Sequence, residues 1–90
     1  MRFAWDQKKA SNNLTKHGIS FDEAATVFGD PLSNTYPDPQ HSMEEQRFII
    51  IGVSEQGRII LVAHTDDGET VRLISAREAT SGERKYYEEG

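Results

Sequence analysis

Apolar and β-branched residues gather in three runs in the second half of the chain, at positions 47–53, 58–65 and 70–77. Two short polar breaks, 54–57 and 66–69, separate the runs, and each break contains a glycine. Runs of this kind, bounded by short breaks that contain glycine, are typical of strands joined by tight turns. The pattern therefore predicts an antiparallel meander of two hairpins.

The lengths of the breaks also predict how the strands align. A four-residue first loop places Arg47 opposite His64, and the second turn continues this alignment into the third strand. Because residues two apart share a face of a strand, Arg47, His64 and Arg77 then lie on one face of the sheet. Arg72 lies on the other face, so Arg72 and Arg77 can share a site only if the strand ends or bulges near Ser75.

Two helices are predicted before the meander. Asp6 has the chemistry of an N-cap, and Gly18 suits the left-handed conformation that ends many helices. Residues 20–23 form a capping box that opens a second helix, which Gly29 and Pro31 end. The second helix carries apolar residues at helical spacing on one face, so we expect it to pack in the core.

The remaining segments complete an α+β fold. Residues 2–5 alternate weakly and predict a short first strand, whereas three prolines within 30–46 predict a loop with a short strand near 33–36. Residues 80–83 form another capping box, which opens a C-terminal helix. We expect one domain, residues 1–90, in which the N-terminal helices pack on an antiparallel meander.

The composition narrows the setting in which the protein acts. The chain has 90 residues and no cysteine, which excludes disulfides and thiolate-bound zinc. No apolar run is long enough to span a membrane, and the first residues lack the apolar core of a signal peptide. These features favour a soluble, cytoplasmic protein. The formal charge of −5 means that any contact with RNA requires a local basic cluster.

Several kinds of site lack the residues that they need. The three histidines have no partner at metal-ligand spacing, so neither a metal nor another cofactor is expected. A nucleophile elbow and a glycine-rich phosphate loop are also absent from the sequence. Cleaving RNA without a metal needs a base, an acid and cations that stabilise the phosphorane, a role that suits arginine. The candidate cations are Arg47, Arg58, Arg72, Arg77 and Arg84, and the candidate proton carriers are His64, His41, Glu45 and Tyr87.

Each candidate also has a purely structural interpretation. Arg72, inside an apolar strand, can pair with a helix carboxylate, and His17 can pack near Trp5 at the end of the first helix. His64 at a strand end fits packing as well as it fits function. Tyr87 on a terminal helix fits a place in the core or a surface that faces a partner.

Beyond single residues, the order of several short motifs resembles that of the BrnT toxins of bacterial type II toxin–antitoxin systems. The resemblance covers nearly the whole chain, with the motif residues in the same order and at the same spacings. These residues are Trp5, Asp6, Lys9, Asn13, Lys16, His17, Gly18, Phe21, Glu23, Ala24, Phe28, Asp30, Pro31, His41, Ser42, Glu45, Arg47, the segment 72–77, Glu83, Arg84 and Tyr87. One departure is Asp67, where relatives often carry a basic residue.

The resemblance implies a RelE-like ribonuclease fold and a toxin that cleaves RNA and arrests translation, here as a metal-independent endoribonuclease. It also implies a BrnA-like antitoxin with a ribbon–helix–helix part, through which the complex contacts DNA indirectly. The candidate catalytic residues are Arg47, His64, Arg72, Arg77 and Tyr87, and the candidate RNA-binding residues are Lys9, Lys16, His17, His41, Arg58 and Arg84. The acidic charge and Asp67 keep an alternative open, a non-catalytic antitoxin-binding module that acts as a co-repressor subunit.

Overall fold

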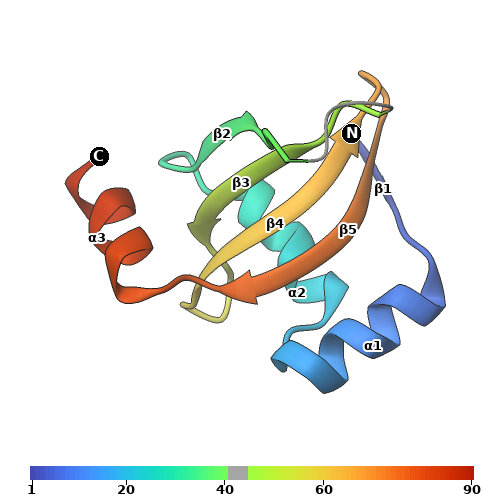
Figure 1. The fold of residues 1–90 in the computed structure, drawn as a ribbon, viewed down its shortest axis with the longest axis horizontal. Helices are drawn as coiled ribbons and strands as arrows, with labels where there is room; N and C mark the ends of the chain where they lie inside the picture. The colour runs from blue at the N-terminus through green and yellow to red at the C-terminus, as the bar shows by residue number, and fades with distance from the viewer. Residues whose placement is uncertain (41–44) are drawn as a thin grey trace.

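A single mixed sheet runs through the molecule, with its strands in the order β1-β5-β4-β3-β2 (Figure 1). The computed structural model describes residues 1–40 and 45–90. The strands are β1 (Arg2–Ala4), β2 (Asn34–Pro37), β3 (Phe48–Val53), β4 (Ile59–Asp66) and β5 (Thr70–Glu78). The predicted meander is confirmed as β3, β4 and β5, which pair antiparallel. The short strands extend it at both edges, because β2 pairs antiparallel with β3 and β1 pairs parallel with β5.

The helices begin and end where their capping residues predict. They are α1 (Gln7–His17), α2 (Phe21–Thr26) with the 3-10 turn η1 (Val27–Gly29), and α3 (Ser81–Glu89). Asp6 accepts a hydrogen bond from the Lys8 amide at the start of α1, and Gly18 ends α1 with φ 70°. The Ser20 hydroxyl accepts from the Glu23 amide in the same way at the start of α2. The α+β class is therefore confirmed.

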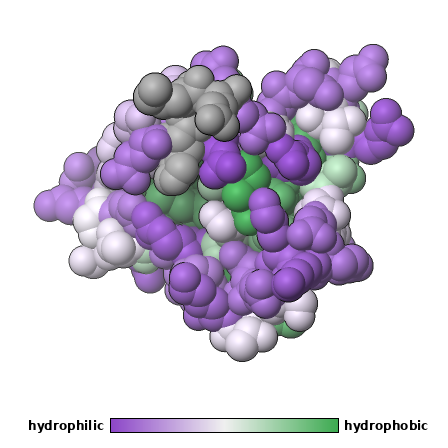
Figure 2. Space-filling view, turned by 45° about the vertical axis from the view of Figure 1, so that its right-hand side comes forward, coloured by the Kyte–Doolittle hydropathy of each residue, from purple (hydrophilic) through white to green (hydrophobic). Residues whose placement is uncertain are grey.

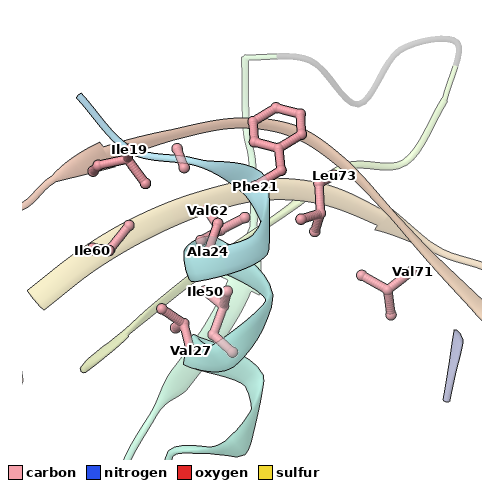
Figure 3. Close-up of a cluster of buried hydrophobic side chains, with 10 residues drawn as sticks. Ile19, Phe21, Ala24, Val27, Ile50, Ile60, Val62, Val71 and Leu73 are labelled. Atoms are coloured by element: carbon pink, nitrogen blue, oxygen red, sulfur yellow. The ribbon is translucent and has the colours of Figure 1, made fainter. Parts of the chain in front are cut away.

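The core lies between α2 and one face of the sheet. Phe21 and Ala24 on α2 and Val27 on η1 are buried against apolar side chains of β3, β4 and β5 (Figure 3). Those strand residues are Ile50, Ile60, Val62, Val71, Leu73 and Ala76. In Figure 1, α2 lies behind the sheet and α3 stands at the left, beyond the end of β5, so the near face of the sheet lacks the cover of α1 and α2.

The alignment of the first hairpin differs from the prediction by one residue. Val53 pairs with Ile59, so the loop between the two strands has five residues, 54–58. The Ser54 amide donates to the Arg58 carbonyl across this loop. This extra residue places His64 opposite Phe48, and the expectation that His64 faces Arg47 is wrong. Since neighbouring residues point to opposite faces, a change of one residue exchanges the faces of β4 relative to β3.

A β-bulge interrupts β5 near Ser75. Ala63 pairs with Ser75 but the next residue on β4, His64, pairs with Leu73, which leaves Ile74 as an extra residue on β5. The extra residue shifts the alternation of side chains between the two faces of β5. Two residues on opposite sides of the bulge therefore share a face when their sequence numbers differ by an odd number. Arg72 and Arg77 could share a site only if the strand ended or bulged near Ser75, and this bulge is present.

Among the described residues, no helix has the length and apolar character that a membrane crossing requires.

Candidate functional site

Arg72 and Arg77 lie on the same face of the sheet. Arg72 pairs with Thr65 and Arg77 with Leu61, two residues that are four apart on β4 and therefore point the same way. Ile60 and Val62, the neighbours of Leu61 on β4, point into the core, so Leu61 points away from it. The two arginines therefore lie on the face turned away from α2. We call this the arginine face. On this side of the molecule, Figure 2 shows apolar surface exposed between hydrophilic side chains.

Glu45 joins two arginines at one end of the arginine face. Arg72 Nη2 donates to Glu45 Oε2 at 2.7 Å, and Arg47 Nε lies 3.8 Å from Glu45 Oε1. The Arg72 and Glu45 side chains are each 48% exposed, so this ion pair forms in contact with solvent. One carboxylate therefore holds two guanidinium groups from different strand ends near each other.

Glu83 holds Arg77 at the other end of the face. Arg77 Nη1 and Nη2 donate to Glu83 Oε1 and Oε2 at 2.8 and 2.9 Å, and the Thr80 amide donates to Glu83 Oε1 at 2.9 Å. The Arg77 hydrogen bonds are the main cause that lowers the pKa of Glu83 to about 2. The Glu83 carboxylate in turn raises the pKa of Arg77. A two-point contact of this kind fixes both the position and the plane of the guanidinium.

His64 does not lie with the arginines. Its side chain is 2% exposed, and its ring packs 4.8 Å from the ring of Phe28 and 6.0 Å from that of Phe48, measured between centroids. The Nδ1 atom lies 3.0 Å from the Val62 carbonyl oxygen, and burial lowers the pKa of His64. The five-residue hairpin loop turns the His64 side chain into the core, so the predicted catalytic His64 lies apart from Arg72 and Arg77.

Tyr87, another predicted catalytic residue, forms a hydrogen bond with the carboxylate at the C-cap of η1. Its hydroxyl donates to Asp30 Oδ2 at 2.5 Å, and the Val53 amide donates to the same oxygen at 2.9 Å. The hydrogen bond to Asp30 is the main cause that raises the pKa of Tyr87 to about 12. Tyr87 therefore fastens α3 to the end of η1 and β3, and its hydroxyl is engaged outside the arginine face.

Arg58 belongs to a structural network on the helix side of the molecule. It donates from Nε and Nη2 to Glu23 and from Nη2 to the Gly18 carbonyl oxygen, at 3.0 Å. Glu23 is 5% exposed and also accepts a hydrogen bond from the Ser54 hydroxyl at 2.7 Å. The Arg58 hydrogen bond is the main cause that lowers the pKa of Glu23. Arg58, which the sequence predicts to bind RNA, thus has its guanidinium engaged by a buried carboxylate, away from the arginine face.

The other expected RNA-binding residues are spread over the surface. Lys9, Lys16 and His17 are exposed on α1, whose Ala10 packs on the core side of the sheet and not on the arginine face. Arg84 is exposed on α3. His41 lies outside the described residues.

Two tyrosines that the sequence did not assign to the site lie beside Arg77. Tyr36 on β2 and Tyr86 on α3 line a pocket together with Ile51, Gly82 and Glu83. Tyr36 pairs with Ile49, which places it on the arginine face. The sequence offers one signal for this pocket, the aromatic Tyr36 in a predicted short strand. The face on which Tyr36 lies depends on how that strand pairs, which the sequence does not show.

Comparison with known proteins identifies the family. A family model described as "Ribonuclease toxin, BrnT, of type II toxin-antitoxin system" matches residues 5–83. The chain belongs to the BrnT family. A crystal structure of the Brucella abortus ribonuclease toxin BrnT, at 1.1 Å resolution, is similar in fold to this BrnT-family chain, with a TM-score of 0.70 and 26% sequence identity. The similarity covers 90% of this chain and 99% of the Brucella chain. No curated protein matches.

Membership of the BrnT family confirms the resemblance found in the sequence and the toxin–antitoxin context that it implied. A type II system pairs its toxin with a protein antitoxin, so an antitoxin partner is implied for this chain.

Proposed function

We propose that this BrnT-family protein is a cytoplasmic, metal-independent endoribonuclease with a RelE-like fold, which cleaves RNA and arrests translation. A BrnA-like ribbon–helix–helix antitoxin neutralises it and contacts operator DNA on behalf of the complex. The observation that carries the catalytic part is the bulge at Ile74, because it brings Arg72 and Arg77 onto one face of the sheet. Family membership supports the toxin role.

The arginines supply the electrostatic part of the reaction. The 2′-hydroxyl of a ribose attacks the adjacent phosphate, and negative charge builds on the phosphate oxygens in the transition state. The bond from phosphorus to the 5′-oxygen of the next nucleotide breaks, which leaves a 2′,3′-cyclic phosphate and a 5′-hydroxyl whose proton comes from solvent. Arg72 and Arg77 donate hydrogen bonds to those oxygens, and Arg47 adds positive charge near Arg72. Glu45 lies between Arg47 and Arg72, where an ionised carboxylate can accept the proton of the 2′-hydroxyl.

The ion pairs of the arginine face are compatible with substrate binding. Arg72 and Glu45 are each 48% exposed, and an exposed ion pair is worth only about 0–1 kcal/mol. A phosphate group can therefore compete with Glu45 for Arg72. Arg77 is held more firmly by its two hydrogen bonds to Glu83. In this arrangement Glu83 is a positioning residue for the Arg77 guanidinium.

The proposal is tested with purified protein and RNA in excess chelator, alongside inducible expression in a bacterial host. We expect the wild type to cleave RNA with chelator present and to stop growth. Arg72→Ala and Arg77→Ala should each lower the cleavage rate by about a hundredfold or more, the usual cost of losing one donor to a developing oxyanion. Arg2→Ala is the matched control, since it removes an exposed arginine of β1 that belongs to no proposed site, and this variant should cleave RNA as the wild type does. Equal cleavage and toxicity of the wild type and both variants would exclude arginine-based catalysis.

A second candidate function is a non-catalytic antitoxin-binding module. Arg47, Arg58, Arg72 and Arg77 each pair with a carboxylate, and the chain carries a formal charge of −5. Paired arginines on an acidic protein favour a protein partner over a polyanion. This candidate predicts a stable complex with a ribbon–helix–helix protein, no growth arrest, and no change in transcript length after induction.

A further inference from the structure

A pocket opens on the arginine face between α3 and the β2 edge of the sheet. Its volume is about 380 Å³, and it is lined by Tyr36, Ile51, Gly82, Glu83 and Tyr86. Ile51 forms an apolar floor that is 1% exposed. The volume falls within the range of sites that bind small molecules or single groups of a larger ligand.

Two aromatic side chains of the pocket are partly exposed to solvent. Tyr36 is 37% exposed and Tyr86 is 56% exposed, whereas Tyr87, one residue further on α3, is held by Asp30. Burial is the main cause that raises the pKa of Tyr36, and the nearby negative charge of Glu83 adds to it. Exposed aromatic rings at the mouth of an apolar pocket can stack on a planar ligand.

The pocket is next to the guanidinium that the proposed function assigns to a phosphate. Arg77 is hydrogen bonded through both Nη atoms to Glu83, and Glu83 is itself a wall of the pocket. An apolar floor, two exposed rings and an adjacent guanidinium match the parts of a nucleotide, which has a flat base on one side and a charged phosphate on the other.

We propose that this pocket binds one unpaired nucleobase of the RNA substrate, stacked on Tyr86 and Tyr36, next to the phosphate that contacts Arg77. The proposal rests on the proposed function and adds a subsite that selects single-stranded RNA. A base inside a duplex is stacked between its neighbours and cannot enter, so the pocket excludes paired regions. Continuity with Arg77 favours RNA over an antitoxin side chain as the occupant.

The test uses single-stranded oligoribonucleotides with 2′-O-methyl groups, which cannot be cleaved by attack of the 2′-hydroxyl. A series of these oligonucleotides carries one abasic residue at each successive position. We expect one position at which loss of the base weakens binding to the wild type by about tenfold, the usual worth of stacking one base. Tyr86→Ala and Tyr36→Ala should weaken binding of the intact oligonucleotide by a similar factor, and Tyr86→Ala combined with the abasic position should lose nothing more.

Tyr86→Phe is the matched control, because it keeps the ring and should keep the affinity. The Tyr86 side chain is exposed, so thermal unfolding of Tyr86→Ala should match that of the wild type. Affinity for a co-purified ribbon–helix–helix antitoxin is measured with the same variants.

A flat abasic series, with Tyr86→Ala binding as the wild type does and Arg77→Ala binding more weakly, would overturn the base pocket while leaving the ribonuclease proposal in place. Loss of antitoxin affinity in Tyr86→Ala, with unchanged RNA affinity, would also overturn it and assign the pocket to the protein partner. A wild type that neither binds nor cleaves RNA would remove the proposed function together with this inference.

Discussion

At the scale of single residues, buried polar side chains connect parts of the chain that the sequence keeps far apart. Asn13, 6% exposed on α1, is the clearest case. Its Nδ2 donates to the Ile19 and Ala76 carbonyl oxygens at 3.0 and 2.9 Å, and its Oδ1 accepts from the Ala76 amide at 2.9 Å. One amide thus satisfies the backbone of a loop and of the last strand together.

Replacing Asn13 by alanine should lower the free energy of unfolding by about 2–3 kcal/mol, because buried backbone groups of Ile19 and Ala76 lose their partner. Urea denaturation of the variant and the wild type measures this difference. Asn12→Ala is the matched control, since Asn12 is exposed on the same helix and should change the stability little. Helix propensity favours alanine over asparagine at both positions, so equal stability changes in the two variants would contradict a large contribution from the buried hydrogen bonds.

The Glu83 carboxylate predicts a pH dependence of stability. Its pKa is lowered from 4.5 to about 2 in the folded protein, so the unfolded chain binds a proton there at a higher pH than the folded chain does. Stability from this group is therefore fully present above pH ~4.5 and is lost as the pH falls towards about 2. Urea denaturation at a series of pH values should show a shallower acid loss for Glu83→Gln than for the wild type. Glu88→Gln, at an exposed position on α3, should leave the slope unchanged.

At the scale of elements, α3 is held to the rest of the fold by side chains at its two ends. None of its residues is fully buried, so packing contributes little to holding it. The capping box of Thr80 and Glu83, with Arg77, fixes its start. The hydrogen bond from Tyr87 to Asp30 fixes its last turn. The pocket beneath α3 depends on both contacts.

Tyr87→Phe should loosen α3 without unfolding the sheet. A hydrogen bond to a charged acceptor contributes about 1.5–3 kcal/mol, so amide hydrogen exchange of the last turn of α3 should accelerate by about tenfold or more. The amides of β4 should exchange at the wild-type rate. Tyr86→Phe is the matched control, because the Tyr86 side chain is exposed. Unchanged exchange in Tyr87→Phe would show that another contact holds the helix.

At the scale of the whole molecule, the protein is acidic and its lysines and arginines are spread over the surface, but three arginines lie near one another on one face of the sheet. The net charge of −5 repels RNA at a distance, whereas Arg47, Arg72 and Arg77 attract phosphates on one face. An RNA complex of this protein should therefore depend on few phosphate contacts and not on a broad basic patch.

Few phosphate contacts predict a weak dependence of RNA affinity on salt. Three contacts to single-stranded RNA correspond to a slope of about −2 when the logarithm of the association constant is plotted against the logarithm of the salt concentration. Each substitution of Arg72 or Arg77 by alanine should reduce the size of that slope by about 0.7. Filter binding of a non-cleavable oligonucleotide at several salt concentrations measures it. A slope several times steeper would show that lysines of α1 also contact the RNA.

Much of the secondary structure could be predicted from the sequence because its signals are local. Asp6, Ser20 and Thr80 each cap a helix through atoms two or three residues away, and the structure confirms all three. The meander was predicted for the same reason, since apolar runs and glycine turns are short-range patterns. Glu23 shows where local signals stop being sufficient. The sequence predicts that its carboxylate completes the capping box of α2, whereas in the structure the carboxylate binds Arg58, a residue 35 positions away.

Membership of the BrnT family, and the order of the helices and of the strands of the meander, were within reach of the sequence alone. The proposal that arginines form the site also began from the sequence. The face on which each arginine lies was not within its reach. One additional residue in the first hairpin loop turns the His64 side chain into the core. One bulged residue, Ile74, places Arg72 on the same face of the sheet as Arg77. A strand's side chains alternate every residue, so a shift of one position reverses a face, and only the packing of distant strands against α2 decides that shift.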